Sequence, residues 1–467
     1  MSRDHEKRIF AGGLKAIPKK IMARFNSGHQ RSAKAKKNIA LSLLFRGINI
    51  AIGFLLVPLI LGYIGQLQYG IWLTLASLIL WFNFFDVGLG HGLRNKLGEA
   101  LAKGNTELGR RYVSTAYAAI FGISVFIFLL GFLIHQFLDW SVLLGVPDQS
   151  RSELGNLAII VFGFFTARLF LNLLISIILA DQQPATRDLI NVISRVVALS
   201  VLYGLTLTTS GSLLYVGIVV SMAPVIVLLV FTLVLFRTRY RHLAPKISQI
   251  DRSLFSDLMN IGGRFFILQI AAVVLYSTDN MIIAHLFSPA QVTPYHIAAQ
   301  YFGIALIGFS IIISPLWSAA TDAYAQNDMR WIRNTVAKLY KVWMLTAVGL
   351  GLLLTVSAWV YDLWLSGTVV IPFALSAVWA IFVATQTFSM IFVQVINGMG
   401  KIRLPMIIGV SSAVLNVPLS IFFARNMGMG IVGVITATLV TQVVGLFFMA
   451  TQYQKLTSGK AHGIWAK

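Results

Sequence analysis

Long apolar stretches separated by short polar segments run along almost the whole chain. Each stretch reaches or exceeds the length of about 18 residues that a helix needs to cross the hydrocarbon core of a bilayer. The pattern predicts an all-α membrane protein of about twelve transmembrane helices. Their expected positions are 39–63, 69–90, 113–134, 155–180, 189–208, 212–236, 257–285, 294–318, 338–359, 370–397, 403–423 and 429–452.

Composition agrees with this pattern. Hydrophobic residues make up 57% of the 467 positions and charged residues 11%, whereas soluble domains carry roughly 45–50% and about 25%. A water-soluble α/β fold is therefore excluded. The chain has no cysteine, which excludes disulfides, thiolate metal sites and cysteine nucleophiles.

The basic residues predict the orientation of the chain in the membrane. The N-terminal tail, the C-terminus and the segments 91–112, 181–188, 237–256, 319–341 and 398–403 hold 31 of the 37 lysines and arginines. The opposite set of loops holds Arg151 and Arg425. The positive-inside rule then places both termini in the cytoplasm, as expected for a multi-pass inner-membrane protein. Short juxtamembrane loops account for the net charge of +21, so nucleic acid is not an expected partner.

Two halves of the chain resemble each other weakly. Arg110, Val113 and Tyr117 recur 223 positions later as Arg333, Val336 and Tyr340, and Gly104-Asn105 corresponds there to Asn327-Asp328. The loop that begins at Asp181 corresponds to the loop that begins at Gly398, 217 positions later. Both halves contain six expected spans that start in the cytoplasm. The pattern predicts two six-helix lobes related by a pseudo-two-fold axis along the membrane normal, as in transporters with parallel repeats. The expected parts are a basic tail (1–38), an N-lobe (39–236), a linker (237–256), a C-lobe (257–452) and a C-terminal tail (453–467).

Four arginines fall inside the expected spans: Arg46, Arg168, Arg195 and Arg264. A charge at the centre of a membrane helix costs about 2.5–3.5 kcal/mol on insertion scales, so these side chains should avoid lipid. They either extend to the interface along their apolar stems or line a cavity between the lobes. A cavity with four guanidinium groups would favour a multivalent anion such as a diphosphate, because guanidinium binds phosphate with two parallel hydrogen bonds.

Acidic and polar residues in the spans are candidates for ion coupling or gating. Asp279, Asn280 and Asp86 could supply oxygens for a coupling Na⁺ or H⁺, and His296 and Gln300 could join Asp279. The alternatives are a helix-end or capping role for Asp86 and a structural salt bridge for Asp279. No His pair at metal-ligand spacing, phosphate-binding loop or nucleophile elbow is present. No metal site, other cofactor or catalytic residue is therefore expected.

Several short runs carry a resemblance to a known family. They are Tyr69-Gly70-Ile71-Trp72, Asp86-Val87-Gly88-Leu89-Gly90, Arg94-Asn95, Glu99-Ala100, Gly104-Asn105 and Asn397-Gly398-Met399-Gly400-Lys401. The chain resembles the bacterial oligosaccharide flippases of the O-antigen type. These belong to the multidrug/oligosaccharidyl-lipid/polysaccharide exporter superfamily.

The resemblance implies alternating access and a lipid-linked oligosaccharide substrate, carried on undecaprenyl diphosphate to the periplasmic leaflet. It also implies that Arg46 and Arg264 contact the pyrophosphate, and a functional link to polysaccharide polymerase and glycosyltransferases. One rival is a cation-coupled multidrug exporter of the sister family. The other is a membrane glycosyltransferase or polymerase of the same pathway. The longest expected outer loop, 135–154, is too short for a catalytic domain, so we expect no enzymatic activity.

Overall fold

The computed structural model describes residues 30–82, 88–144, 146, 151–259 and 278–466. Over this part of the chain the regular secondary structure is helical throughout, with no β-strand. Within the described ranges, ten helices are long and apolar enough to cross a membrane. The first half contains α2 (Gln30–Phe82), α3 (Leu89–Ala102), α4 (Thr106–His135), α5 (Trp140–Leu144), α6 (Arg151–Leu171), α7 (Leu173–Ala180), α8 (Pro184–Thr208) and α9 (Leu213–Arg237). The second half contains α11 (Asp279–Leu286), α12 (Val292–Ile313), α13 (Leu316–Ala325), α14 (Met329–Leu365), α15 (Phe373–Gly398), α16 (Arg403–Ile421) and α17 (Ile431–Thr457).

Helix α2 accounts for the first two expected spans. Its backbone leaves the helical conformation at Gly65, where φ is 76° and ψ is 172°, a region that glycine reaches without steric cost. The two segments line one cavity with Ile60 and Tyr69, so the chain turns back at this break. The expected span at 257–285 falls mostly outside the described residues, apart from α11. The other nine long helices match the nine remaining expected spans, which agrees with about twelve transmembrane helices.

Several helices begin before the apolar stretch that predicted them. Helix α4 starts at Thr106 instead of residue 113, and α14 starts at Met329 instead of residue 338. Each has a polar cap: the Asn105 side chain accepts a hydrogen bond from the Leu108 amide at 2.9 Å, and Asp328 accepts one from Trp331 at 2.8 Å. Hydropathy marks only the part of a helix that lies in lipid, whereas capping stabilises polar turns beyond it.

The turns before α4 and α14 have the same backbone hydrogen bonds, 223 positions apart. Gly104 and Asn327 both have positive φ, 69° and 57°. The residue after each donates its amide to the carbonyl five positions earlier. The second pair of turns is also alike, but its equivalent left-handed residues are Gln182 and Gly400. Gln182 and Gly400 are 218 positions apart, one more than the offset that the loop sequences predicted. The left-handed residue at the end of each helix, and not the loop composition, shows which positions of the two halves are equivalent.

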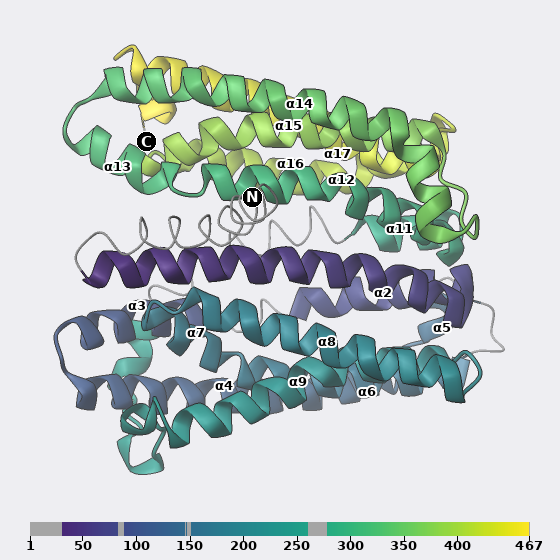
Figure 1. Ribbon diagram of the computed structural model, residues 1–467, viewed down its shortest axis with the longest axis horizontal. Coiled ribbons are helices and arrows are strands. Elements are labelled where there is room, and N and C mark those ends of the chain that lie inside the picture. The colour runs from purple at the N-terminus through teal and green to yellow at the C-terminus, as the bar shows by residue number, and fades with distance from the viewer. Residues whose placement is uncertain (1–29, 83–87, 145, 147–150, 260–277, 467) are drawn as a thin grey trace, which may run out of the picture.

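The two halves of the chain lie on opposite sides of a boundary that α2 and α12 line (Figure 1). The loops that carry most of the basic residues lie at one end of the bundle, on the left in Figure 1, which we name the basic end. The other end, which we name the far end, contains the break in α2 at Gly65 and the short helices α5 and α11. This arrangement is the pair of lobes that the sequence predicted.

Hydrogen bonds between the halves lie toward the far end, within the described part of the molecule. Gln66 donates its amide to the Ala290 carbonyl at 3.0 Å, and Thr293 donates its hydroxyl to the Gln66 carbonyl at 2.9 Å. The Trp364 indole donates to the Phe54 carbonyl at 2.8 Å. These bonds join α2 to α12, α14 and the turn before α12.

The buried apolar core follows the same division. One cluster contains residues of both halves, for example Leu75 of α2 and Val292 and Phe302 of α12. Two further clusters, toward the basic end, each belong to a single half. Among the described residues, the halves therefore share a core toward the far end and have separate cores toward the basic end.

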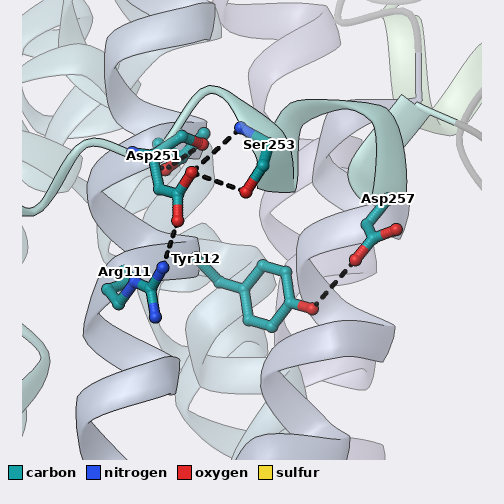
Figure 2. Close-up of polar contacts among 6 residues, drawn as sticks. Arg111, Tyr112, Asp251, Ser253 and Asp257 are labelled. Carbon is teal, nitrogen blue, oxygen red and sulfur yellow. Dashed lines mark hydrogen bonds and ion pairs between the residues drawn. The ribbon is translucent and has the colours of Figure 1, made fainter.

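The linker between the halves is docked on α4 (Figure 2). Arg111 forms an ion pair with Asp251, and Tyr112 donates to Asp257 at 3.4 Å. The amide of Asp251 donates to the Thr115 hydroxyl at 3.0 Å, and Leu243 of the linker is fully buried. The described part of the linker is therefore packed against the first half.

Candidate functional site

A cavity of about 850 Å³ lies between the two halves. Its walls come from both segments of α2 and from α6, α8 and α9 of the first half, and from α12 of the second half. Its volume is in the range of about 300–1,000 Å³ that is typical of small-molecule sites. We name it the central cavity.

Arg195 of α8 lines the central cavity and contacts α2. Its Nη1 donates to the main-chain oxygen of Asn49 at 2.9 Å. The guanidinium fits there because residue 53 has no side chain: a Cβ at Gly53 would lie 2.6 Å from Nη1. Gln300 of α12 lies on the same side of Gly53, with its Nε2 at 3.8 Å from that Cβ position. Arg195 thus lies where α2, α8 and α12 meet.

Arg168, in the last turn of α6, lines the same cavity. Its Nε is buried and has no hydrogen-bond partner. Within the described residues, neither Arg168 nor Arg195 forms a salt bridge with a carboxylate, in contrast to the four arginines whose ion pairs are seen. The central cavity therefore holds two guanidinium groups whose charge no described side chain neutralises.

Polar and aromatic residues complete the wall of the central cavity. His296 and Gln300, four positions apart on α12, face it from the second half, and Tyr69 and Trp72 face it from α2. Asn191 lies one helical turn from Arg195 on α8 and also lines it. Sequence reasoning did not identify Asn191, although a polar residue four positions before an intramembrane arginine marks the same helix face.

Arg46 lies outside the lining of the central cavity. Its Nε donates to Oδ2 of Asp188 at 3.2 Å, and Ser42 donates to the same oxygen. Arg187 donates to the other oxygen of Asp188, Oδ1, through Nε at 2.9 Å and Nη2 at 2.7 Å. Arg46 precedes the lining residue Asn49 by about one helical turn, toward the basic end. The structure thus brings Arg168 and Arg195 together and places Arg46 beside an acidic partner.

Arg264 and Asp86 lie outside the described residues, so their predicted roles stay predictions. Asp279 is buried in the far-end half of the molecule, 6% exposed, and is not part of the cavity wall. The Tyr295 hydroxyl donates to its Oδ2 at 2.5 Å, while its Oδ1 has no hydrogen-bond partner. The neighbouring Asn280 donates to the Leu73 carbonyl of the first half at 3.4 Å. No salt bridge of Asp279 is seen in the described part of the chain, so the gating or coupling role stays a prediction.

Among the described residues, no group of three or more histidines and carboxylates is placed to hold a metal ion. The described wall of the central cavity offers two guanidinium groups, amide donors and aromatic faces. Such a set can bind an anion through charge-assisted hydrogen bonds.

The fold and the cavity define the class of protein: a polytopic helical membrane protein built as two halves around a central cavity. Its fold is that of a transporter. A solved structure of a multidrug resistance MATE family transporter of the MOP superfamily, in its inward-facing conformation, superposes with a TM-score of 0.71 at 14% identity. The superposition covers 88% of this chain and 100% of that one.

Sequence comparison points to a narrower group. The chain is 19% identical over 296 residues to a Salmonella typhi protein named "Putative O-antigen transporter", covering 63% of this chain and 65% of that one. It is 21% identical over 281 residues to a Yersinia pseudotuberculosis protein named "Putative O-antigen export protein", covering 60% and 63%. These matches span somewhat less than two thirds of the relatives' length. No profile of a known family matches the chain. The expected resemblance to proteins of the O-antigen exporter type is confirmed by these relatives, and the shared fold agrees with it.

Proposed function

We propose that this protein is a flippase that moves an undecaprenyl-diphosphate-linked oligosaccharide, of the O-antigen type, from the cytoplasmic to the periplasmic leaflet. The observation that carries the proposal is the pair Arg168 and Arg195, which face a cavity between two halves without a neutralising acid among the described residues. A diphosphate supplies the missing negative charge and accepts bidentate hydrogen bonds from guanidinium. Similarity to proteins named as O-antigen transporters supports the choice of the attached sugar.

In this proposal the basic end faces the cytoplasm, and the halves are separated there to admit the head group. The central cavity takes the diphosphate and the first sugar, while the prenyl chain stays in the surrounding lipid. Opening toward the periplasm requires the far-end hydrogen bonds of Gln66 with Ala290 and Thr293 to break. The substrate supplies the free energy for this change through its contacts with both halves.

The main rival is a cation-coupled multidrug exporter, since the fold is shared with MATE transporters. Two unpaired guanidinium groups in the cavity would repel a cationic drug, so the described lining disfavours this function. A glycosyltransferase or polymerase would need catalytic carboxylates or a metal near the substrate. The described cavity wall provides neither.

The experiment that tests the proposal is reconstitution in liposomes with a fluorescent prenyl-diphosphate sugar on both leaflets. Wild-type protein should transfer the lipid across the bilayer, whereas Arg168→Gln with Arg195→Gln should lower the rate about 100-fold, since each charged contact is worth about 1.5–3 kcal/mol. Arg237→Gln is the matched control, because it removes one positive charge at an exposed position at the end of α9. Equal rates for wild type and the double variant would reject the proposal.

We also propose that Asp279 couples transport to a proton rather than to Na⁺. A single buried carboxyl with one described donor, the Tyr295 hydroxyl, provides one proton site but too few oxygens to surround a sodium ion. Transport by the wild type should respond to a pH gradient and not to a Na⁺ gradient. Asp279→Asn should transport at a rate that no longer depends on the pH gradient. A response of that variant identical to the wild type would place coupling elsewhere.

A further inference from the structure

A second polar pocket lies inside the first half, apart from the boundary between the halves. Its volume is about 270 Å³, and it lies between α3, α4, α6, α7 and α8. The polar residues that line it are His91, Arg94, Asn172, Ser176, Arg187 and Asn191. No carboxylate is among the described residues of its wall. We name it the lateral pocket.

The charge around the lateral pocket is positive. Arg187 shares the buried Asp188 with Arg46, and one carboxylate neutralises only one of these two guanidinium groups. Arg94 of α3 adds a further positive charge, and it forms no salt bridge within the described chain. Helix α3 begins at Leu89, and the next residue, Gly90, lines the pocket. The positive end of the helix dipole therefore lies at the pocket. The pocket therefore attracts an anion.

The lateral pocket is connected to the central cavity by shared helix faces. Asn191 lines both spaces. Helix α8 carries Arg187, Asn191 and Arg195 at intervals of four positions. Residues at this spacing lie on one face of a helix, about 6 Å apart along its axis, so the three form one stripe. On α6 and the residue that follows it, Arg168 faces the central cavity and Asn172 the lateral pocket, again four positions apart.

We propose that the lateral pocket is a second diphosphate site, occupied before the central cavity on the path from the basic end. The inference rests on the proposed flippase function, since it assigns the anion to the substrate's pyrophosphate. Arg94 and Arg187 hold the anion first, and Asn191 then donates to it as it moves to Arg195 and Arg168. A pocket of about 270 Å³ admits a diphosphate without its sugars, so the site selects the shared head group and not the oligosaccharide.

The stripe on α8 explains why the two sites act in sequence. Asn191 offers a neutral amide between two guanidinium groups, so an anion that leaves one arginine keeps a hydrogen-bond donor until it reaches the next. Direct contact between Arg187 and Arg195 would instead create like-charge repulsion that only a bound anion could offset. A stepwise path of this kind keeps the diphosphate solvated by protein groups while it crosses a region of low dielectric constant.

The test measures binding stoichiometry in nanodiscs of zwitterionic lipid, by native mass spectrometry with geranyl diphosphate as the probe. Wild-type protein should bind two equivalents. Arg94→Gln should lose one equivalent, with its affinity weakened about tenfold or more, and Arg168→Gln with Arg195→Gln should lose the other. Lys103→Gln is the matched control, because it removes the same charge from an exposed position just after α3. If Arg94→Gln fails to fold, Asn172→Leu replaces it, since it removes a lining donor without removing a charge.

The outcomes separate the two claims. One equivalent in the wild type, lost with Arg168 and Arg195 but retained by Arg94→Gln, overturns the lateral pocket and keeps the proposed function. Binding that none of the variants weakens overturns both. Inorganic pyrophosphate should compete at both sites, which shows that the head group alone is recognised. Displacement of the Arg94-dependent equivalent by phosphatidylglycerol would assign the pocket to a membrane lipid and overturn its place on the transport path.

Discussion

Arg195 of α8 donates a hydrogen bond to the main-chain oxygen of Asn49 in α2, at 2.9 Å between Nη1 and the oxygen. The contact engages one nitrogen of the guanidinium group of a residue that lines the central cavity. It also explains a glycine in the middle of a membrane helix, since a side chain at residue 53 would occupy the place of Nη1. The position of the Arg195 guanidinium thus depends on Gly53, which has no side chain.

Gly53→Ala should therefore impair the site without unfolding the protein. The added Cβ would lie 2.6 Å from Nη1, the mobile end of a long side chain, so the arginine moves and α2 does not. We expect the rate of lipid transfer to fall about tenfold, which corresponds to the loss of one charged hydrogen bond. Fluorescence dequenching in liposomes measures that rate.

Gly47→Ala is the control, because it lies on the same helix and an added Cβ would meet no atom within 4 Å. Thermal unfolding should be similar for both variants. A normal transfer rate in Gly53→Ala would mean that the position of the Arg195 guanidinium does not limit transport.

Gly70→Ala should weaken the contact that closes the far end. A Cβ at this position would lie 1.8 Å from the main-chain oxygen of Pro289, and backbone cannot yield as a side chain can. We expect the two halves to separate at the far end and the protein to populate its outward-open state. The chain has no native cysteine, so spin labels at the exposed positions Gln68→Cys and Gln291→Cys report the distance by electron paramagnetic resonance.

Gly62→Ala provides the comparison on the same helix, since no atom lies within 4 Å of its added Cβ. The distance distribution of that control should match the parent. An unchanged distribution in Gly70→Ala as well would show that the turn at Pro289 adjusts locally and does not hold the halves together.

The sequence was sufficient for the spans and for the position of Arg168 and Arg195 inside the bundle, whereas their role in binding stays a prediction. Membrane helices are recognised by length and hydropathy, and the cost of a charge in lipid directs Arg168 and Arg195 inward wherever the bundle has space. The partner of Arg46 could not be found in this way. Asp188 is 142 positions away, at the start of a helix, and nothing local marks a pair that only the packing of α2 on α8 creates.

Closure of the far end was equally beyond sequence reasoning. The expected loop at 64–68 is a break at Gly65 alone. Each of the two hydrogen bonds made by Gln66 joins a side-chain donor to the main-chain oxygen of a residue more than 200 positions away. Because the main-chain carbonyl group is the same in every residue, the pattern of side chains does not predict which carbonyl groups accept these hydrogen bonds. The predicted offset between the two halves was one residue too small at the second turn. The equivalent left-handed residues there are Gln182 and Gly400, which differ in type, so the sequence does not mark them as a pair.

Docking of the linker on α4 should depend on pH through Asp251 (Figure 2). Hydrogen bonds from Ser253, and then from Arg111, lower the pKa of this carboxyl below its ordinary value of 3.8. A carboxyl whose pKa is lower in the folded state stabilises that state above its ordinary pKa, and the contribution is lost as the pH falls through the lowered value. Asp251→Asn should therefore speed amide exchange of the linker at pH 7.

The same variant should differ little from the wild type once the pH is below the lowered pKa of Asp251, where the wild-type carboxyl is protonated too. Hydrogen exchange followed by mass spectrometry, with the samples equilibrated at each pH, measures the difference. Asp257→Asn serves as the comparison, since it removes a nearby carboxylate that Tyr112 contacts. Equal protection of the linker in wild type and Asp251→Asn at pH 7 would show that the remaining contacts, among them the buried Leu243, hold the linker without the ion pair.

A double-mutant cycle on Arg46 and Asp188 decides whether Arg46 touches substrate or only holds α2 to α8. Asp188 is buried, with 5% of its side chain exposed, whereas 42% of the Arg46 side chain is exposed. Asp188→Asn should lower the free energy of unfolding by about 2–4 kcal/mol, because two arginines lose a shared buried partner. Arg46→Gln should lower it by less than about 1 kcal/mol, as expected for a pair screened by solvent.

Transport then separates the two roles. If Arg46 contacts the pyrophosphate, Arg46→Gln should slow lipid transfer about tenfold in the wild-type background and again in the Asp188→Asn background, so that the two effects add. Arg46→Lys should recover part of the rate, since lysine keeps the charge but lacks the planar fork that binds phosphate with two hydrogen bonds. If Arg46 acts only through Asp188, Arg46→Gln should have no further effect once Asp188 is gone. That second result would exclude Arg46 from contact with the substrate and leave this role to the arginines that line the central cavity and the lateral pocket.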